Sequence, residues 1–183
     1  PESFKVGFVG NLLRVKGIEE LIEAARLTRD RGLDIEFVVV GDDAHPSLGW
    51  RARGLNLLGL RQNMRAEVEE MLDRHSLRDR VHLIGFTADI ARAYRRMDVL
   101  AFPSHYDAPG RPIFEAAFFS VPSIVAVREP KPDTLVDGVT GLAIEPRWVE
   151  QLSRAIERLA GNRETTRRMG EAAHRLAVSQ FDV

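Results

Sequence analysis

Residues 98–127, DVLAFPSHYDAPGRPIFEAAFFSVPSIVAV, contain the pattern that decides the fold. The stretch opens with a short apolar run at 98–102 that is typical of a buried strand. Pro112 suits the first position of a helix, where its missing N–H has no partner to lose. Pro122 disfavours helical backbone in the residue before it, so we expect the helix to end just ahead of it. The apolar run 123–127 then begins another strand, and the stretch predicts a strand–helix–strand unit.

The same alternation of short apolar runs and helical periodicity continues over the rest of the chain. It predicts an α/β fold: a Rossmann-like, doubly wound, mainly parallel six-stranded sheet with helices on both faces, whose ligands bind beyond the carboxyl ends of the strands. Residues 43–60 show little periodicity and are expected to form an irregular insertion. The expected strands are 5–9, 35–40, 81–84, 98–102, 123–127 and 142–144, and the expected helices are 18–32, 63–75, a short one with Thr87 as its N-cap, 112–120, 149–161 and 162–179.

Composition bounds the class of protein. The chain has 183 residues, 44% of them hydrophobic, and a formal net charge of −1 with both signs interspersed, which gives no support to nucleic-acid binding. The absence of cysteine excludes disulfides and fits a reducing compartment, so we expect a cytoplasmic location. No apolar run reaches the ~20 residues of a membrane span, and no signal peptide is visible. Because residue 1 is Pro rather than Met, we expect one domain of a longer protein.

Two carboxylates mark the candidate site. Asp107 lies in a Pro/Gly-rich loop, and Glu115 is expected in the first turn of the following helix, at its positive end. Together with free amides at the helix start, they can hold a ligand that carries hydroxyl groups and a diphosphate. The amides available are those of Gly110, Arg111, Ile113 and Phe114, since Pro109 and Pro112 have none.

Simpler interpretations compete with these roles. Asp107 could close an Asx turn, Glu115 could merely complement the helix dipole, and Gly110 could do no more than permit the turn. No Ser-His-Asp arrangement, P-loop, metal-ligand spacing or G-x-G-x-x-G fingerprint is present, so the sequence does not favour a dinucleotide oxidoreductase.

The order of the motifs resembles the donor-binding, C-terminal domain of retaining GT-B glycosyltransferases of the large family 4 group. Pro103-Ser104, Gly110, Glu115-Ala116 and Pro122 stand in register with its donor signature, although Asp107 replaces a Glu and Ser120 replaces a Gly. The resemblance covers nearly the whole chain and leaves only 43–60 outside it. The other matching segments are GFVGNLLRVKG (7–17), VHLIGFTADIARAYRRMDVLAFPS (81–104), LVDGVTGLAIEP (135–146) and RRMGEAA (167–173).

The resemblance implies a role for each matching residue. Lys16 would neutralise the diphosphate, Glu115 would accept hydrogen bonds from the ribose, and Asp107 would bind a hydroxyl of the donor sugar. Asn11 stands where the family has an Arg, so one cation is missing. The remaining implied binding residues are Gly10 and Asn11 in the first loop, Phe86 and Thr87 at the nucleobase, Gly110, Arg111 and Ile113 at the helix start, and Arg14 or Arg111 as a substitute for the missing cation. Against these roles, Lys16 could be a solvated loop lysine and Phe86 a core residue.

The resemblance thus implies the donor half of an enzyme that moves a sugar from a UDP- or GDP-sugar to an acceptor hydroxyl, with retention and without a metal or other cofactor. The acceptor, a glycan, lipid or small molecule, would bind an N-terminal domain that is absent from this chain, and peripheral membrane association would come through that domain. The chain alone should bind the donor and transfer nothing. Two alternatives stay open: a sugar-nucleotide epimerase of the same architecture, and a non-catalytic domain that binds a nucleotide or a partner.

Overall fold

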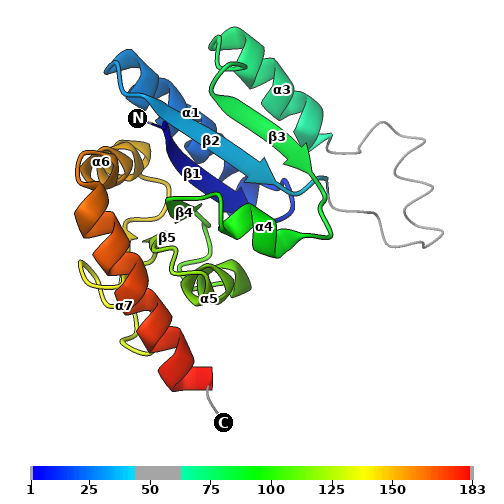
Figure 1. The fold of residues 1–183 in the computed structure, drawn as a ribbon. Helices are drawn as coiled ribbons and strands as arrows, with labels where there is room; N and C mark the ends of the chain where they lie inside the picture. The colour runs from blue at the N-terminus through cyan, green and yellow to red at the C-terminus, as the bar shows by residue number, and fades with distance from the viewer. Residues whose placement is uncertain (1, 44–62, 182–183) are drawn as a thin grey trace, which may run out of the picture.

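One six-stranded sheet organises the chain, as seen in a computed structural model that describes residues 2–43 and 63–181 (Figure 1). The strand order is β3-β2-β1-β4-β5-β6, and every neighbouring pair is parallel. This confirms the predicted Rossmann-like, doubly wound fold. The expected insertion at 43–60 lies almost wholly outside the described residues. The strands are β1 (Phe4–Val9), β2 (Ile35–Val40), β3 (Val81–Gly85), β4 (Val99–Phe102), β5 (Ser123–Ala126) and β6 (Gly141–Ile144).

Helices cover both faces of the sheet, as predicted (Figure 1). One layer consists of α1 (Ile18–Asp30), α3 (Met64–Arg74) and α6 (Val149–Ala160). The opposite face carries the short α4 (Ile90–Tyr94) and α5 (Arg111–Phe118). The last helix, α7 (Arg163–Phe181), packs against both α6 and α5 beside the β6 edge.

Two hydrophobic clusters fill the space between sheet and helices, because the strands alternate their side chains between the faces. Phe37 and Val39 of β2 point into the cluster under α1, α3 and α6. Leu100 and Phe102 of β4 point into the cluster under α4 and α5. Strands buried on both sides read as continuous apolar runs, which is why the sequence revealed them. The α4 side is covered less completely, since Ile84 of β3 is 55% exposed.

Three local expectations need correction. Thr87 is not the N-cap of α4; Asp89 is, because its Oδ1 accepts from the Arg92 N–H at 3.0 Å, while the Thr87 hydroxyl oxygen accepts from the Asp89 N–H at 3.2 Å. The helix α5 begins at Arg111 rather than Pro112, with Gly110 as N-cap. Glu115 is therefore its fifth residue and lies just beyond the first turn.

The backbone at position 120 has a conformation that favours glycine. The helix α5 ends at Phe118, and Ser120 follows in the left-handed region with φ of 58°. A non-glycine residue there carries a backbone strain of roughly 1 kcal/mol. The replacement of Gly by Ser is thus first a matter of backbone conformation.

Candidate functional site

The crevice at the carboxyl ends of β1 and β4 is where a ligand is expected, because the strand order reverses between these two central strands. The loops that leave the two strands are joined by hydrogen bonds. The His105 N–H donates to the Val15 carbonyl at 2.9 Å, and the Ser104 hydroxyl donates to the same oxygen at 3.3 Å. Gly17 has φ of 78°, and a Cβ there would overlap the carbonyl oxygen of Pro103. The crevice wall is therefore fixed by backbone contacts.

A buried acid–imidazole pair reinforces this junction. His105 Nε2 lies 2.7 Å from Glu20 Oε1, and each side chain is 15% exposed. The other carboxylate oxygen of Glu20 is buried and has no hydrogen-bond partner among the described residues. Sequence reasoning missed this pair, because the two residues lie 85 positions apart and neither belongs to a motif.

Lys16 ends the short 3₁₀ helix η1 (Arg14–Lys16) that follows β1. Its ammonium nitrogen lies 6.0 Å from the ring centroid of Phe102 and 5.6 Å from that of Tyr106, within the range of cation–π contacts. Within the described ranges, no carboxylate pairs with this ammonium. Lys16 is half-buried, so it is held in place while its charge remains available for an anion, unlike a freely solvated loop lysine.

Phe102 connects Lys16 to the start of α5. A Cβ at Gly110 would touch the end of the Phe102 ring, so only glycine lets the helix N-terminus approach this closely. In the part of the chain that the structure describes, the amides of Gly110 and Arg111 have no acceptor. The Ile113 amide is not free, contrary to expectation: its N–H donates to the Gly110 carbonyl at 3.0 Å, and its side chain is 4% exposed.

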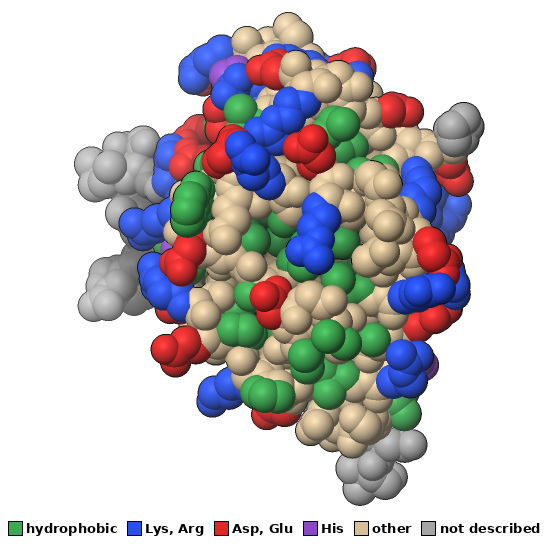
Figure 2. Space-filling model, turned by 90° about the vertical axis from the view of Figure 1, so that its left-hand side faces the viewer, with side chains coloured by type: hydrophobic (Ala, Val, Ile, Leu, Met, Phe, Trp, Pro, Cys, Tyr) green, Lys and Arg blue, Asp and Glu red, His purple; other side chains and the backbone are tan. Residues whose placement is uncertain are grey.

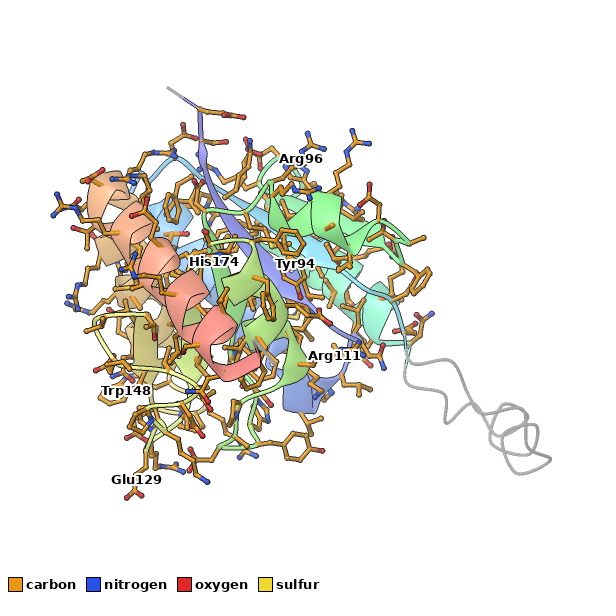
Figure 3. The ribbon with its side chains drawn as sticks, turned by 60° about the horizontal axis from the view of Figure 1, so that its bottom comes forward. Tyr94, Arg96, Arg111, Glu129, Trp148 and His174 are labelled. Carbon is orange, nitrogen blue, oxygen red and sulfur yellow. The ribbon has the colours of Figure 1, made fainter. Side chains whose placement is uncertain are left out.

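Glu115 is held by two contacts. Its Oε2 accepts from the Tyr94 hydroxyl at 2.8 Å, and its Oε1 lies 3.0 Å from Arg111 Nε. In Figure 3, Tyr94 lies beside α5 and Arg111 at its N-terminal end. Tyr94 is fully buried and stacks on Phe119. Burial first, and then its bond to Glu115, raises the pKa of Tyr94 far above the ordinary value, so the phenol stays protonated and donates.

This arrangement gives Glu115 more than a helix-dipole role. Its side chain is 32% exposed, so the carboxylate is oriented by Tyr94 and Arg111 while part of it remains open to solvent. Each carboxylate oxygen has a second lone pair that can accept from a ligand hydroxyl. Tyr94 is the functional residue that sequence reasoning missed here, since its aromatic ring suggests only core packing.

Asp107 binds Arg128, a contact called here the Asp107 clasp, and does not form an Asx turn. Its two oxygens accept from the backbone N–H of Arg128 at 2.8 Å and from the guanidinium of the same residue at 2.9 Å. Arg128 also pairs with Glu145 at 2.9 Å. The backbone hydrogen bond from Arg128, followed by its side chain, holds the pKa of Asp107 below the ordinary range. The clasp fastens the β4 loop to the exit of β5.

The remaining predicted residues lie in loops that follow the carboxyl ends of strands. Phe86 follows β3 and is 82% exposed, so the alternative of a core residue is wrong. Asn11 is exposed, and Gly10 donates its N–H to the Val40 carbonyl at 3.0 Å. Of the two candidates for the missing cation, Arg14 is engaged by Glu19 and Glu67.

Arg111 is the better-placed substitute. It is 87% exposed at the start of α5 and has Glu115 as its partner. A ligand anion at this helix start would therefore meet both its guanidinium and the free amides.

Surface charge agrees with the composition. On the face shown in Figure 2, basic and acidic side chains are interspersed and form no continuous basic field. No described helix is long and apolar enough to cross a membrane.

Known proteins resemble this chain over almost its full length. The sequence model of the family described as glycosyl transferases group 1 matches residues 1–176. Among curated relatives, alpha-D-kanosaminyltransferase of Streptomyces kanamyceticus is 27% identical over 96% of this chain and 41% of its own length. The D-inositol 3-phosphate glycosyltransferase of Actinosynnema mirum is 30% identical over 88% of this chain and 39% of its own.

Solved structures agree in fold. The structure of Anabaena HepE in complex with UDP has a TM-score of 0.82 and 25% identity, covering 98% of this chain and 45% of that one. The C-terminal domain of the Francisella tularensis group 1 protein LpcC has a TM-score of 0.79 and 24% identity, covering 99% of this chain and 87% of that one.

The chain therefore spans about two fifths of the length of the curated relatives that it matches. The matched region of LpcC, in contrast, is nearly the whole of a structure described as a C-terminal domain. With the family match over residues 1–176 and this fold, the chain belongs to the glycosyl transferases group 1 family and has the GT-B C-terminal domain architecture.

Proposed function

We propose that this chain binds the nucleoside-diphosphate sugar donor of a retaining glycosyltransferase. The observation that carries the proposal is that Phe102 at the end of β4 lies near both the Lys16 ammonium and Gly110 at the start of α5, where Arg111 pairs with Glu115. An ammonium and free helix amides are suited to a diphosphate, and a carboxylate is suited to a vicinal diol. The UDP complex of HepE, a protein with the same fold, supports a uridine nucleotide.

The diphosphate lies between Lys16 and the amides of Gly110 and Arg111 in this proposal. These groups neutralise the negative charge that develops on the leaving group when the anomeric C–O bond breaks. Because Lys16 is steadied by two aromatic rings and the amides by Phe102, they need little reorganisation during the reaction.

The nucleoside extends from the diphosphate along the carboxyl edge of the sheet. Glu115 accepts from the ribose hydroxyls, and the exposed ring of Phe86, beside Thr87, contacts the base. The carboxylate of Asp107, which Arg128 holds at the exit of β5, accepts from a hydroxyl of the transferred sugar. No metal is required in this scheme, since cationic side chains and amides supply the compensating charge.

The acceptor and the completed catalytic cleft belong, in this proposal, to another domain of a longer protein. The length comparison supports this, because each curated relative has more than half of its chain outside the match. The 183-residue chain should bind donor and show no transfer.

A thermal-shift panel of UDP-, GDP- and ADP-sugars tests the proposal, since a ligand that binds only the folded state raises the melting temperature. We expect a shift with UDP-sugars that persists in EDTA. Glu115→Gln should remove most of the shift while still accepting from Tyr94. Glu129→Ala, an exposed acid at the exit of β5, is the matched control and should keep the shift. An unchanged shift in the Glu115 variant would remove Glu115 from the site.

The non-catalytic alternative is favoured by one observation, the uncharged and exposed Asn11. Introducing Asn11→Arg into the longer protein that carries the acceptor domain distinguishes an enzyme from a non-catalytic binding domain. A gain in turnover shows an enzyme with a weakened phosphate site, and no turnover with any donor in either form supports a binding domain.

A further inference from the structure

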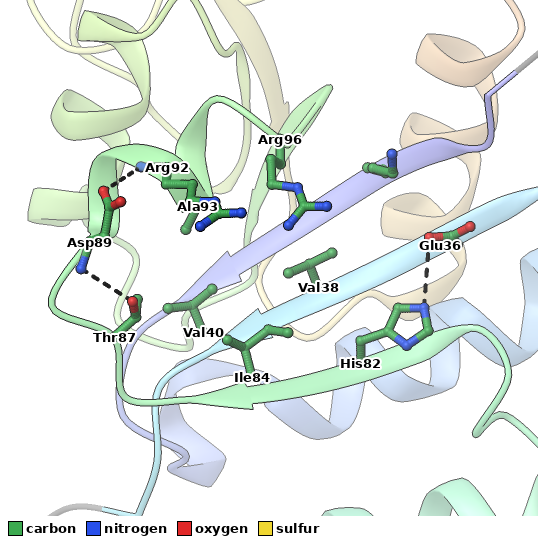
Figure 4. Close-up of a pocket in the computed structure, with 11 residues that line it drawn as sticks. Glu36, Val38, Val40, His82, Ile84, Thr87, Asp89, Arg92, Ala93 and Arg96 are labelled. Atoms are coloured by element: carbon green, nitrogen blue, oxygen red, sulfur yellow. Dashed lines mark hydrogen bonds and ion pairs between the residues drawn. The ribbon is translucent and has the colours of Figure 1, made fainter.

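A second concave site lies on the open face of the sheet beside α4 (Figure 4). This groove, the α4 groove, has a volume of about 410 Å³, within the range of small-molecule sites. Its apolar floor is made by Val38 and Val40 of β2 and Ile84 of β3, the last 55% exposed. The groove exists because α4 is only five residues long and leaves the face of β2 and β3 uncovered.

Most charged groups at the groove already have partners. Asp89 caps α4 through the Arg92 N–H, and Lys5 pairs with Glu2 at 2.7 Å. Glu36 lies 3.7 Å from His82 Nε2 across the far end. Each of these groups therefore already has a partner within the protein.

Arg92 and Arg96 differ from these groups. Arg92 lies in α4 and Arg96 in the turn that follows it, and Figure 4 shows both guanidinium groups extending over the floor. Within residues 2–43 and 63–181, neither guanidinium lies within ion-pair distance of a carboxylate, although the charge of Arg96 acts on the Glu2 carboxylate and helps to lower its pKa. Their neighbour Arg95 is different, because its guanidinium lies over the Phe119 ring, 5.2 Å from the centroid.

We propose that the α4 groove binds a small amphiphilic anion, a phosphate or carboxylate group carried on an apolar body. The two guanidinium groups, neither of them in a close ion pair among the described residues, match the planar, bidentate geometry of such oxyanions. The apolar floor gains free energy only if the ligand also covers it, so inorganic phosphate alone is an incomplete ligand. The α4 groove is distinct from the β1/β4 crevice, because Thr87 is the only residue lining it that also belongs to the proposed donor-binding residues.

Amide chemical-shift mapping on the ¹⁵N-labelled chain tests this, with octyl phosphate below its micelle concentration as the probe. We expect saturable shifts at Val38, Val40, Ile84 and Ala93. Inorganic phosphate and 1-octanol, which each lack one half of the ligand, should bind at least tenfold more weakly. Equal binding of phosphate alone, or of octanol alone, overturns the two-part recognition.

Charge-removing variants locate the oxyanion. Arg92→Gln combined with Arg96→Gln should weaken octyl phosphate binding at least tenfold, and Arg95→Gln, the control between them in sequence, less than twofold. Both proteins are checked for folding by their spectra without ligand. Full affinity in the double variant, or shifts at Lys16 and Gly110 in place of the groove, contradicts the proposal. Glu115→Gln should leave octyl phosphate binding unchanged, so this test and that of donor binding fail independently.

Discussion

The β1/β4 crevice and the α4 groove hold their charges in opposite ways. In the crevice the acids are oriented by protein partners, Glu115 by Tyr94 and Asp107 by Arg128, and the ammonium of Lys16 lies against aromatic rings. In the groove two arginines extend over an apolar floor, and neither forms a close ion pair with a described carboxylate. A site whose groups are fixed in advance suits chemistry at one bond, because it needs little reorganisation. A site with free arginines suits simple capture of an anion.

The largest expected effect comes from breaking the backbone junction of the crevice. Gly17→Ala should cost more than about 3 kcal/mol of unfolding free energy, since it adds left-handed strain and an overlap with the Pro103 carbonyl. Gly32→Ala is the matched control, with φ of 73° and open space around its Cβ position, and should cost roughly 1 kcal/mol. Urea unfolding of both variants measures the difference. Equal costs would mean that the two loops are not fixed by this contact.

Removing the crevice ammonium should affect ligand binding and leave the groove alone. Lys16→Met keeps an apolar stem against Phe102 and Tyr106, so folding should be retained. We expect UDP affinity, by calorimetric titration, to fall about 10- to 100-fold, or about 1.4–2.8 kcal/mol. Binding of octyl phosphate should not change. Loss of both would show one shared anion site in place of two.

Tyr94 tests how firmly Glu115 is oriented. Tyr94→Phe removes a buried hydrogen bond to a carboxylate and should cost about 1.5–3 kcal/mol of stability, with weaker UDP binding as a consequence. Tyr106→Phe, an exposed ring whose hydroxyl has no hydrogen-bond partner among the described residues, is the control and should change stability by less than about 0.5 kcal/mol. Unaltered UDP affinity in Tyr94→Phe contradicts the orienting role.

The smallest effect concerns acid pH. The pKa of Asp107 is lowered in the folded chain, so its clasp contributes stability above the ordinary aspartate pKa and loses it as the pH falls through the lowered value. Arg128→Gln should raise the Asp107 pKa, measured by carboxyl-carbon NMR titration, but only part of the way. The backbone N–H of residue 128, the larger cause, remains in that variant. An unchanged pKa would assign the whole effect to the backbone.

Sequence reasoning located the elements well because both faces of this sheet are buried. The run that became β4 is apolar throughout, the run of β2 is apolar apart from Glu36, and Pro122 marked the end of α5 correctly. The N-cap of α4 was misplaced by two residues, since Thr87 and Asp89 are both good capping residues and only the backbone decides between them.

The site was predicted less completely, for a physical reason. Lys16 and Glu115 follow from motifs, but the groups that orient them come from distant positions: Tyr94 from α4, and the Glu20–His105 pair from across the β1/β4 junction. Such contacts leave no trace in local periodicity. The α4 groove is likewise invisible in sequence, because it depends on how little of the sheet a five-residue helix covers.

Mapping UDP onto the ¹⁵N-labelled chain by amide chemical shifts tests the central claim most directly. Binding in the crevice predicts saturable shifts along the carboxyl edge of the sheet, at the loops of Lys16, Phe86 and Gly110, with the amides of Val38 and Ala93 unmoved. Shifts confined to the α4 groove, or no saturable shift at millimolar UDP in a folded chain, would contradict the account.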